Sequence, residues 1–259
     1  MLISMDNITI FTVDCGDIPL EETKKYKICL DRLKEILPKN VNFKIFTKED
    51  QIVKDCFEEF KNYFNLIKLE QKTSFSAAYI SDVIRIYILS KNKHYLYLDA
   101  DIYIKDFSFL EELKEEALYI NDCSTSIMYS GDDEKKFEKI LDFYKKQKHV
   151  VSDSAVIDFS KKNNIGIKKS EFYCNCLHFF GGMFRKTTKI LVFFKRYDKE
   201  KFINIKENPN ILSFFFSEDV RKYNIKVNFN TFVYWDTFNM EEMIEVIKKV
   251  FPEKKIVVI

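Results

Sequence analysis

The sequence Phe75–Ile104, FSAAYISDVIRIYILSKNKHYLYLDADIYI, decides the fold that we expect for this chain. Its first half, Phe75–Leu89, has few polar side chains, which is typical of a helix buried on all sides. Its second half, His94–Ile104, is an apolar run rich in tyrosine and isoleucine, which indicates a buried strand. We therefore expect a buried helix, followed by a strand that carries two carboxylates, Asp99 and Asp101.

The preceding residues predict a parallel arrangement. We expect strands at Ile8–Val13 and Val41–Phe46, and each is followed by apolar residues at helical spacing, Pro19–Leu37 and Gln51–Ile67. An alternation of strands and helices is typical of a parallel sheet with crossover helices. The sequence thus predicts an α/β fold, with a Rossmann-type mixed sheet flanked by helices.

The rest of the chain has a less regular pattern. The expected helices are 107–116, 134–148, 152–164, 187–197 and 240–250, and the expected strands are 117–120, 172–184 and 225–234. The length of 259 residues suits one large domain, and no low-complexity linker or internal repeat divides it. We therefore expect a single domain over residues 1–259.

Composition excludes several classes of protein. The 42 Lys and Arg residues are balanced by 40 Asp and Glu residues, whereas nucleic-acid-binding proteins usually have a cationic excess. The five glycines cannot form a dinucleotide-binding fingerprint or a P-loop. No apolar run approaches the ~20 residues that span a membrane, and no secretory signal precedes the six cysteines. We expect a cytoplasmic protein with reduced thiols and no nucleic-acid partner.

Asp99 and Asp101 are candidate ligands for a divalent metal. They lie two positions apart on an extended segment, so their side chains point to one side. Two carboxylates ~5 Å apart repel by about 3 kcal/mol at an effective dielectric of ~20, and a cation between them removes that cost. Mg²⁺ and Mn²⁺ prefer oxygen ligands and often share them with phosphates. A polar strand end that leads into a turn explains the same motif without a metal.

Asp82 and Arg85 form the second candidate motif. Their i, i+3 spacing places them on one face of the predicted buried helix. A charge pair in such a helix is costly unless both partners are satisfied. Two interpretations remain open: an internal structural salt bridge, or a pair that faces a polar pocket and binds ribose or sugar hydroxyls.

These residues together resemble a known family. Ala77–Leu89, which contains Ser81-Asp82-x-x-Arg85, is followed by Tyr97-Leu98-Asp99-Ala100-Asp101. This pattern is similar to that of the DXD-type sugar transferases, which include fungal Golgi mannosyltransferases and the catalytic domains of the large glucosylating bacterial toxins. The resemblance implies the GT-A fold, with residues 1–106 as the nucleotide-sugar-binding half and 107–259 as the acceptor-side half.

The resemblance also implies an activity. The chain would be a hexosyltransferase that moves a sugar from a nucleotide-sugar, expected to be a UDP-sugar, to an acceptor hydroxyl with retention of configuration. The acceptor would be a glycan or a lipid-linked molecule in bacterial surface glycan synthesis, and the reaction would depend on Mn²⁺ or Mg²⁺. The lysines in and after the C-terminal helix would suit peripheral contact with an anionic membrane face, although a solvated helix face explains them as well.

Site roles follow from the resemblance, position by position. Asp82 and Arg85 would hold the donor sugar, while Asp99 would contact ribose or sugar and share the metal with Asp101. The nucleotide-sugar would further contact Thr12, Val13, Asp14, Ser81, Tyr97, Gly181 and Gly182. A simple turn between a strand and a helix explains the two glycines equally well. His178 is the candidate for a third metal ligand, because the Ser-x-Trp-like C-terminal segment of many family members is not found here. Glu218, Asp219 and Asp236 are the other candidates.

Two other functions compete with this one. Phosphatases that form an aspartyl phosphate also place Asp-x-Asp after an apolar strand, but a threonine or valine usually follows, where this chain has Ile102-Tyr103. A non-catalytic nucleotide-sugar-binding protein would lack the C-terminal segment of the family. The sequence leaves the oligomeric state open.

Overall fold

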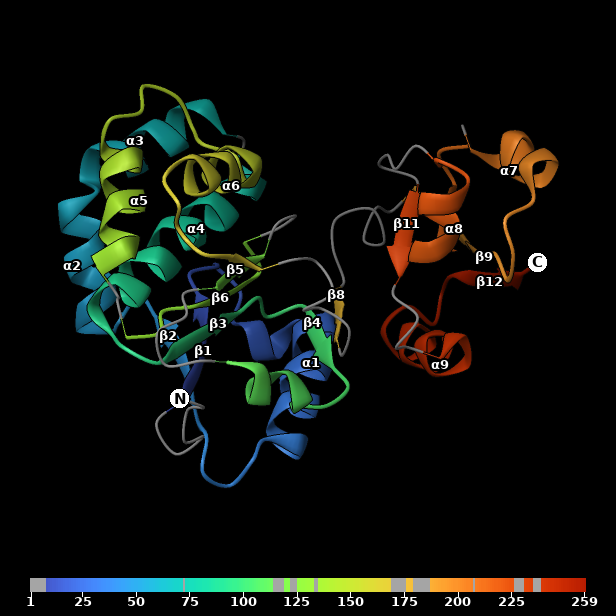
Figure 1. The fold of residues 1–259 in the computed structure, drawn as a ribbon, viewed down its shortest axis with the longest axis horizontal. Helices are drawn as coiled ribbons and strands as arrows, with labels where there is room; N and C mark the ends of the chain where they lie inside the picture. The colour runs from blue at the N-terminus through green and yellow to red at the C-terminus, as the bar shows by residue number, and fades with distance from the viewer. Residues whose placement is uncertain are drawn as a thin grey trace. The chain divides into compact units, whose positions relative to one another are not determined.

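The computed structural model describes residues 8–71, 73–113, 119–121, 125–132, 135–168, 176–178, 187–206, 208–225, 231–234 and 239–259. The chain forms two compact units, whose elements are labelled in Figure 1. The first unit comprises residues 1–100 and 106–172, and the second comprises residues 101–105 and 173–259. Two such units can still belong to one folding domain, so the single domain stays a prediction.

The first unit is built on a mixed sheet with strand order β2-β1-β3-β6-β5-β7. Its strands are β1 (Thr9–Asp14), β2 (Asn42–Thr47), β3 (Tyr95–Leu98), β5 (Tyr119–Asn121), β6 (Ile127–Tyr129) and β7 (Ile167–Lys168). Both β2 and β3 pair with β1 in parallel, whereas β6 is antiparallel to β3. The expected α/β fold with a mixed sheet and flanking helices is confirmed.

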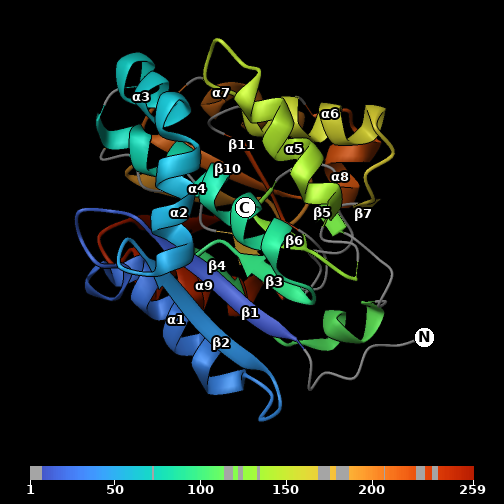
Figure 2. The ribbon, with the colours of Figure 1, turned by 90° about the vertical axis from the view of Figure 1, so that its left-hand side faces the viewer.

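Helices cover both faces of the parallel strands. They are α1 (Lys24–Ile36), α2 (Gln51–Glu59), α3 (Lys61–Glu70), α4 (Thr73–Lys91), α5 (Lys135–Lys145) and α6 (Asp153–Lys162). Short 3₁₀ turns, η2 (Leu20–Glu22) and η3 (Ser108–Glu112), complete the unit. The chain passes from β1 to β2 on one side and returns to β3 on the other. Right-handed crossovers then place α1 on one face and α2 and α4 on the opposite face, as Figure 2 shows.

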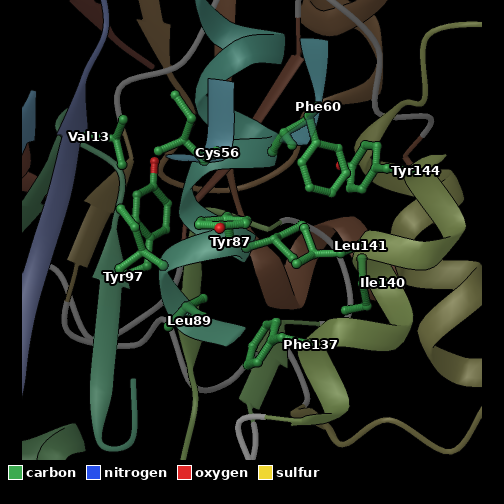
Figure 3. Packing of buried hydrophobic residues seen from close by; sticks show 14 of the residues in the cluster. Val13, Cys56, Phe60, Tyr87, Leu89, Tyr97, Phe137, Ile140, Leu141 and Tyr144 are labelled. Atoms are coloured by element: carbon green, nitrogen blue, oxygen red, sulfur yellow. The ribbon is translucent and has the colours of Figure 1, made fainter. Parts of the chain in front are cut away.

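Helix α4 lies at the centre of the first unit's core. It packs against β1 and β3 and against α2, α3 and α5. Figure 3 shows Tyr87 and Leu89 of this helix beside Tyr97 of β3 and near Phe137 of α5. Side chains from Val83 to Leu89 are fully or almost fully buried, as the apolar sequence predicts. Among the described helices, including α4, none is long and apolar enough to cross a membrane.

The second unit contains a parallel sheet with strand order β11-β10-β9-β12. Its strands are β9 (Ile190–Phe193), β10 (Ile211–Phe216), β11 (Thr231–Tyr234) and β12 (Lys255–Val258), and its helices are α7 (Lys199–Ile205), α8 (Ser217–Lys222) and α9 (Met240–Val250). Two pairs of stacked rings join neighbouring strands of this sheet. The ring centroids of Phe193 and Phe214 are 4.3 Å apart, and those of Phe194 and Phe215 are 4.4 Å apart. A separate antiparallel pair joins β4 (Ile102–Ile104) to β8 (Cys176–His178).

Several expected elements differ from those observed. The helix expected at 187–197 is wrong, because the β-branched and aromatic run at Ile190–Phe193 forms strand β9. The strand expected at 94–104 is divided into β3 and β4, which belong to different sheets. The helix expected at 51–67 is interrupted at Phe60, whose φ of −105° and ψ of 18° are not helical.

Other differences concern boundaries and omissions. The helix expected from Pro19 begins at Lys24, because Thr23 is extended and separates it from the 3₁₀ turn η2. The helix expected at 107–116 is described only as the 3₁₀ turn η3. Strands β6, β10 and β12 were not predicted, since each is a short apolar run without a distinct period.

Candidate functional site

The candidate site lies at the edge of the first sheet where β1 and β3 end. These two strands are parallel neighbours, so their carboxyl ends meet at the same edge. From β1 the chain continues to β2 on one side, and from β3 it continues to β5 and β6 on the other side, which makes this point the topological switch point of the sheet. Open α/β sheets bind ligands at such points. Asp14 ends β1, and Asp99 follows directly after β3.

The buried guanidinium of Arg85 is the centre of this site. Its side chain is only 4% exposed and projects from α4 toward the end of β3. Nη2 lies 2.5 Å from Asp82 Oδ1, one turn earlier on the same helix. Nη1 donates to Asp99 Oδ1 at 2.9 Å. Arg85 therefore links the two sequence motifs that were predicted separately.

Three further groups complete the surroundings of Arg85. The Tyr97 hydroxyl lies 3.3 Å from Nη1 and donates to Asp99 Oδ1 at 2.5 Å. The guanidinium also lies over the Tyr97 ring, 5.0 Å from its centroid. Nη2 donates to the Thr125 hydroxyl and lies 3.4 Å from Asp153 Oδ1. Thr125 in turn donates to Asp153 Oδ1 at 2.7 Å.

The site carries more negative than positive charge. Three carboxylates, those of Asp82, Asp99 and Asp153, face one guanidinium. Burial raises the pKa of Asp82 to about 7; Arg85 opposes this rise, and the charges of Asp153 and Asp99 add to it. Burial alone would lower the pKa of Arg85, but the negative groups, Asp82 first, hold it well above its ordinary value. The cation is thus permanent, whereas the total negative charge depends on pH.

Tyr97 keeps its proton in this environment. Burial, followed by the charge of Asp99, holds the pKa of its hydroxyl well above the ordinary value. A neutral phenol is a donor, so Tyr97 and Arg85 both donate to the same oxygen of Asp99. Because the ring is buried, Tyr97 acts through Asp99, whose orientation it fixes.

Exposure increases from the centre of the site outward. The side chains of Asp82, Asp99 and Asp153 are 16%, 24% and 45% exposed, against 4% for Arg85. The carboxylates therefore border solvent while the cation does not. A molecule with hydroxyl groups can reach the carboxylates without displacing Arg85.

The structure brings four of the predicted site residues into direct contact: Asp82, Arg85, Tyr97 and Asp99. Ser81 is half-buried beside Asp82 on α4. Thr12 and Val13 are buried in β1, so only their backbone can lie against a nucleotide. Asp14 is half-buried, and its Oδ2 accepts a hydrogen bond from the Leu20 amide at 3.0 Å.

The predicted metal ligands are described only in part. Asp101 is half-buried and belongs to the second unit. The backbone of His178 pairs with Ile102 in the β4–β8 ladder, but its side chain lies outside the described residues, as do Gly181 and Gly182. Among the residues that the structure describes, no three His, Cys, Asp or Glu side chains are grouped to hold a metal ion.

Carboxylates are nevertheless the ligands that Mg²⁺ and Mn²⁺ prefer. Such ions commonly take one or two protein carboxylates and complete their shell with phosphate oxygens and water. Asp99 and Asp101 fit this pattern in kind. Of the other candidates for a third ligand, Asp219 accepts a hydrogen bond from the Tyr197 amide at 3.0 Å, Glu218 is exposed on α8, and Asp236 lies outside the described residues.

Thr125 and Asp153 were not predicted from the sequence. Thr125 lies just before β6, and Asp153 is the first residue of α6, after the N-cap Ser152. The cap sequence at Ser152 indicates a helix start and gives no sign of a distant partner. Asp153 is 68 positions from Arg85, so only the tertiary fold joins them.

Comparison with known proteins adds little to this geometry. No family model and no curated protein matches the chain. Among solved structures, the chain is similar to one described as PaToxG glycosyltransferase, at 13% sequence identity and a TM-score of 0.38. The match covers 96% of this chain and 84% of that chain. A similarity of this degree does not define an activity, so the site itself must carry the functional argument.

Proposed function

We propose that this chain is a glycosyltransferase that moves a hexose from a UDP-sugar to an acceptor hydroxyl, with a divalent metal and with retention of configuration. The observation that carries the proposal is the contact of Asp82, Arg85 and Asp99 at the switch point of the sheet. These residues come from two motifs whose order and spacing resemble those of DXD-type sugar transferases. The acceptor that we propose is a glycan or a lipid-linked molecule of surface glycan synthesis.

The charged groups suit a nucleotide-sugar better than a purely structural role. Asp82 and Asp99 are two carboxyl groups against one guanidinium, and both border solvent. A carboxylate at a solvent border accepts hydrogen bonds from sugar hydroxyls, and such charge-assisted bonds are the stronger ones. Arg85 holds both carboxylates in fixed positions, which reduces the entropy lost when a sugar binds.

In the proposed reaction the chain positions the donor and shields it from water. Asp82 and Arg85 orient the hexose, and Tyr97 fixes the orientation of Asp99. When bound at Asp99 and Asp101, Mn²⁺ or Mg²⁺ supplies positive charge that stabilises the departing diphosphate. The acceptor hydroxyl then meets a sugar held in one orientation, which is the advantage of proximity.

A thermal-shift screen of nucleotide-sugars with and without Mn²⁺ tests the proposal. We expect UDP-sugars to raise the melting temperature only when Mn²⁺ is present, and Asp101→Asn to remove this dependence together with UDP-sugar hydrolysis. Asp142→Asn, an exposed position on α5, is the matched control. If Asp101→Asn retains Mn²⁺-dependent hydrolysis and transfer, the proposed role of the metal is wrong.

A non-catalytic nucleotide-sugar-binding protein is the second candidate. It is favoured by one feature of the sequence, in which the Ser-x-Trp-like segment of many DXD-type transferases is not found. Calorimetry distinguishes the two, because a non-catalytic protein would bind UDP equally well without Mn²⁺ and would release no free sugar. Turnover of a generic aryl phosphate in the same preparation would instead support a phosphatase.

A further inference from the structure

Asp153 is the carboxylate of the site that lies farthest from Arg85, and it adds to a negative charge that already exceeds the positive charge. Arg85 already has Asp82 at 2.5 Å and Asp99 at 2.9 Å, whereas Asp153 lies farther away, at 3.4 Å. A third carboxylate adds repulsion between like charges in a partly buried place. Asp153 also lies in the first turn of α6, where a negative charge is favourable, so the direction of its side chain toward Arg85, and not its charge alone, indicates a role at the site.

The orientation of Asp153 leaves one of its oxygens available. Oδ1 accepts the Thr125 hydroxyl at 2.7 Å and faces Arg85. Within the described part of the chain, Oδ2 has no hydrogen-bond partner, and the side chain is 45% exposed. Thr125 is itself almost fully buried, and its hydroxyl accepts from Arg85 while donating to Asp153. The carboxylate is therefore held by one oxygen and presents the other to solvent.

The guanidinium of Arg85 also has a nitrogen without a hydrogen-bond partner among the described residues. The Nε of Arg85 is buried and has no hydrogen-bond partner in the described residues. Buried polar groups in folded proteins are nearly always paired, and an unpaired one calls for an explanation such as a ligand. The unpaired Nε and the open Oδ2 of Asp153 both belong to the surroundings of Arg85, which the described residues therefore satisfy incompletely.

We infer that Asp153 is a specificity-determining residue of the donor site, whose Oδ2 accepts a hydrogen bond from a hydroxyl of the hexose. Thr125 is the positioning residue that fixes the Asp153 carboxylate. This inference rests on the proposed function and adds a recognition element on α6, which neither sequence motif includes. The hydrogen-bond acceptor is a charged carboxylate. A UDP-sugar that lacks the hydroxyl, or carries it in the opposite configuration, therefore leaves the carboxylate unsatisfied and binds weakly.

The test compares UDP with UDP-sugars on the same variants. Calorimetry in Mn²⁺ measures the affinity of the parent and of Asp153→Asn for UDP, UDP-glucose, UDP-galactose and UDP-N-acetylglucosamine. For the sugar that the parent prefers, we expect Asp153→Asn to lose about 10- to 100-fold in affinity, which is the loss typical of a hydrogen bond to a charged group. Affinity for UDP should change less than about twofold, because UDP has no hexose. If Asp153 had only a structural role, Asp153→Asn would lower the affinities for UDP and for UDP-sugars by similar factors.

Two further variants sharpen the result. Asp158→Asn lies on the same helix at an exposed position and should change neither affinity. Thr125→Val should lower the affinity for the preferred UDP-sugar, and Thr125→Ser should restore it. If Asp153→Asn binds UDP-sugars as tightly as the parent does, or if its affinity for UDP falls by the same factor as its affinity for UDP-sugars, the inference about Asp153 is wrong. The proposed function then still stands. If the parent binds UDP but no UDP-sugar, both are wrong.

Discussion

Replacement of Arg85 by methionine tests the physical account of the site most directly. Methionine keeps an unbranched stem of similar length, so the packing of α4 changes little, while the positive charge is lost. The substitution leaves Asp82, Asp99 and Asp153 facing each other in a place where the first two are at least three-quarters buried. Tyr97 and Thr125 also lose a partner.

The magnitude follows from the distances. At an effective dielectric of ~20, unit charges 2.5 to 3.4 Å apart attract by roughly 5–7 kcal/mol for each pair. The desolvation of Arg85 and of its partners offsets most of this sum, and truncation of one member of a buried pair usually costs about 3–5 kcal/mol. We expect Arg85→Met to lower the free energy of unfolding by about 3–5 kcal/mol. The loss should be smaller at pH 5 than at pH 8, because protonation of Asp82 relieves the repulsion.

Hydrogen exchange measured by mass spectrometry on peptides from α4 and β3 is the suitable assay, because it reports the opening of the first unit alone. Lys27→Met is the control. Its pair with Asp31 spans 2.8 Å, but both side chains are more than half exposed, so its removal should cost about 0–1 kcal/mol. An Arg85→Met variant as stable as Lys27→Met at pH 8 would refute the view that three carboxylates depend on this cation.

Three other predictions concern the same unit. Burial raises the pKa of Asp82 to about 7, so the folded protein binds a proton there that the unfolded chain has released; stability should fall as pH rises from about 4 to 7, and Asp82→Asn should flatten this slope in urea titrations at pH 4.5 and 7.5. Equal slopes in both proteins would contradict it. Tyr97→Phe removes the donor to Asp99 and should lower the free energy of unfolding by about 1.5–3 kcal/mol in urea, and an unchanged midpoint would count against the bond. Phe137→Ala, in the fully buried core, should cost about 3–5 kcal/mol, whereas Leu69→Ala, at an 85% exposed position, should cost little; similar losses for the two would refute the assigned core.

Much of the first unit could be predicted because its signals are local. The strands at the start, the buried helix α4 and strand β3 follow from hydrophobic period and run length, which depend on neighbours in sequence. The contact of Asp82 with Arg85 follows from their spacing on one helix. The second unit was predicted poorly, because its short apolar strands lack a distinct period, and the run at Ile190–Phe193 was mistaken for part of a helix.

The sequence predicted only those contacts of the candidate site whose residues lie close together along the chain. The sequence placed Asp99 at the end of a buried strand, but gave no reason to connect it with Arg85 beyond the resemblance. In the structure, Arg85 donates to Asp99, and the paired aspartates do not form one uninterrupted strand end: Asp99 follows β3, while Asp101 precedes β4 in another sheet.

The sequence by itself determined the central elements of this protein: an apolar helix with one charge pair, and a strand that ends in a carboxylate. Hydrophobic periodicity and the cost of burying charge decide these features, and both depend on residues that are close together in the sequence. Only the tertiary structure decided which groups surround Arg85. Thr125 and Asp153 reach it from distant segments because sheet pairing of β6 with β3 and packing of α5 on α4 bring those segments to the same edge. A guanidinium can bind several acceptors at once, and the chain supplies them through its fold, not through a motif.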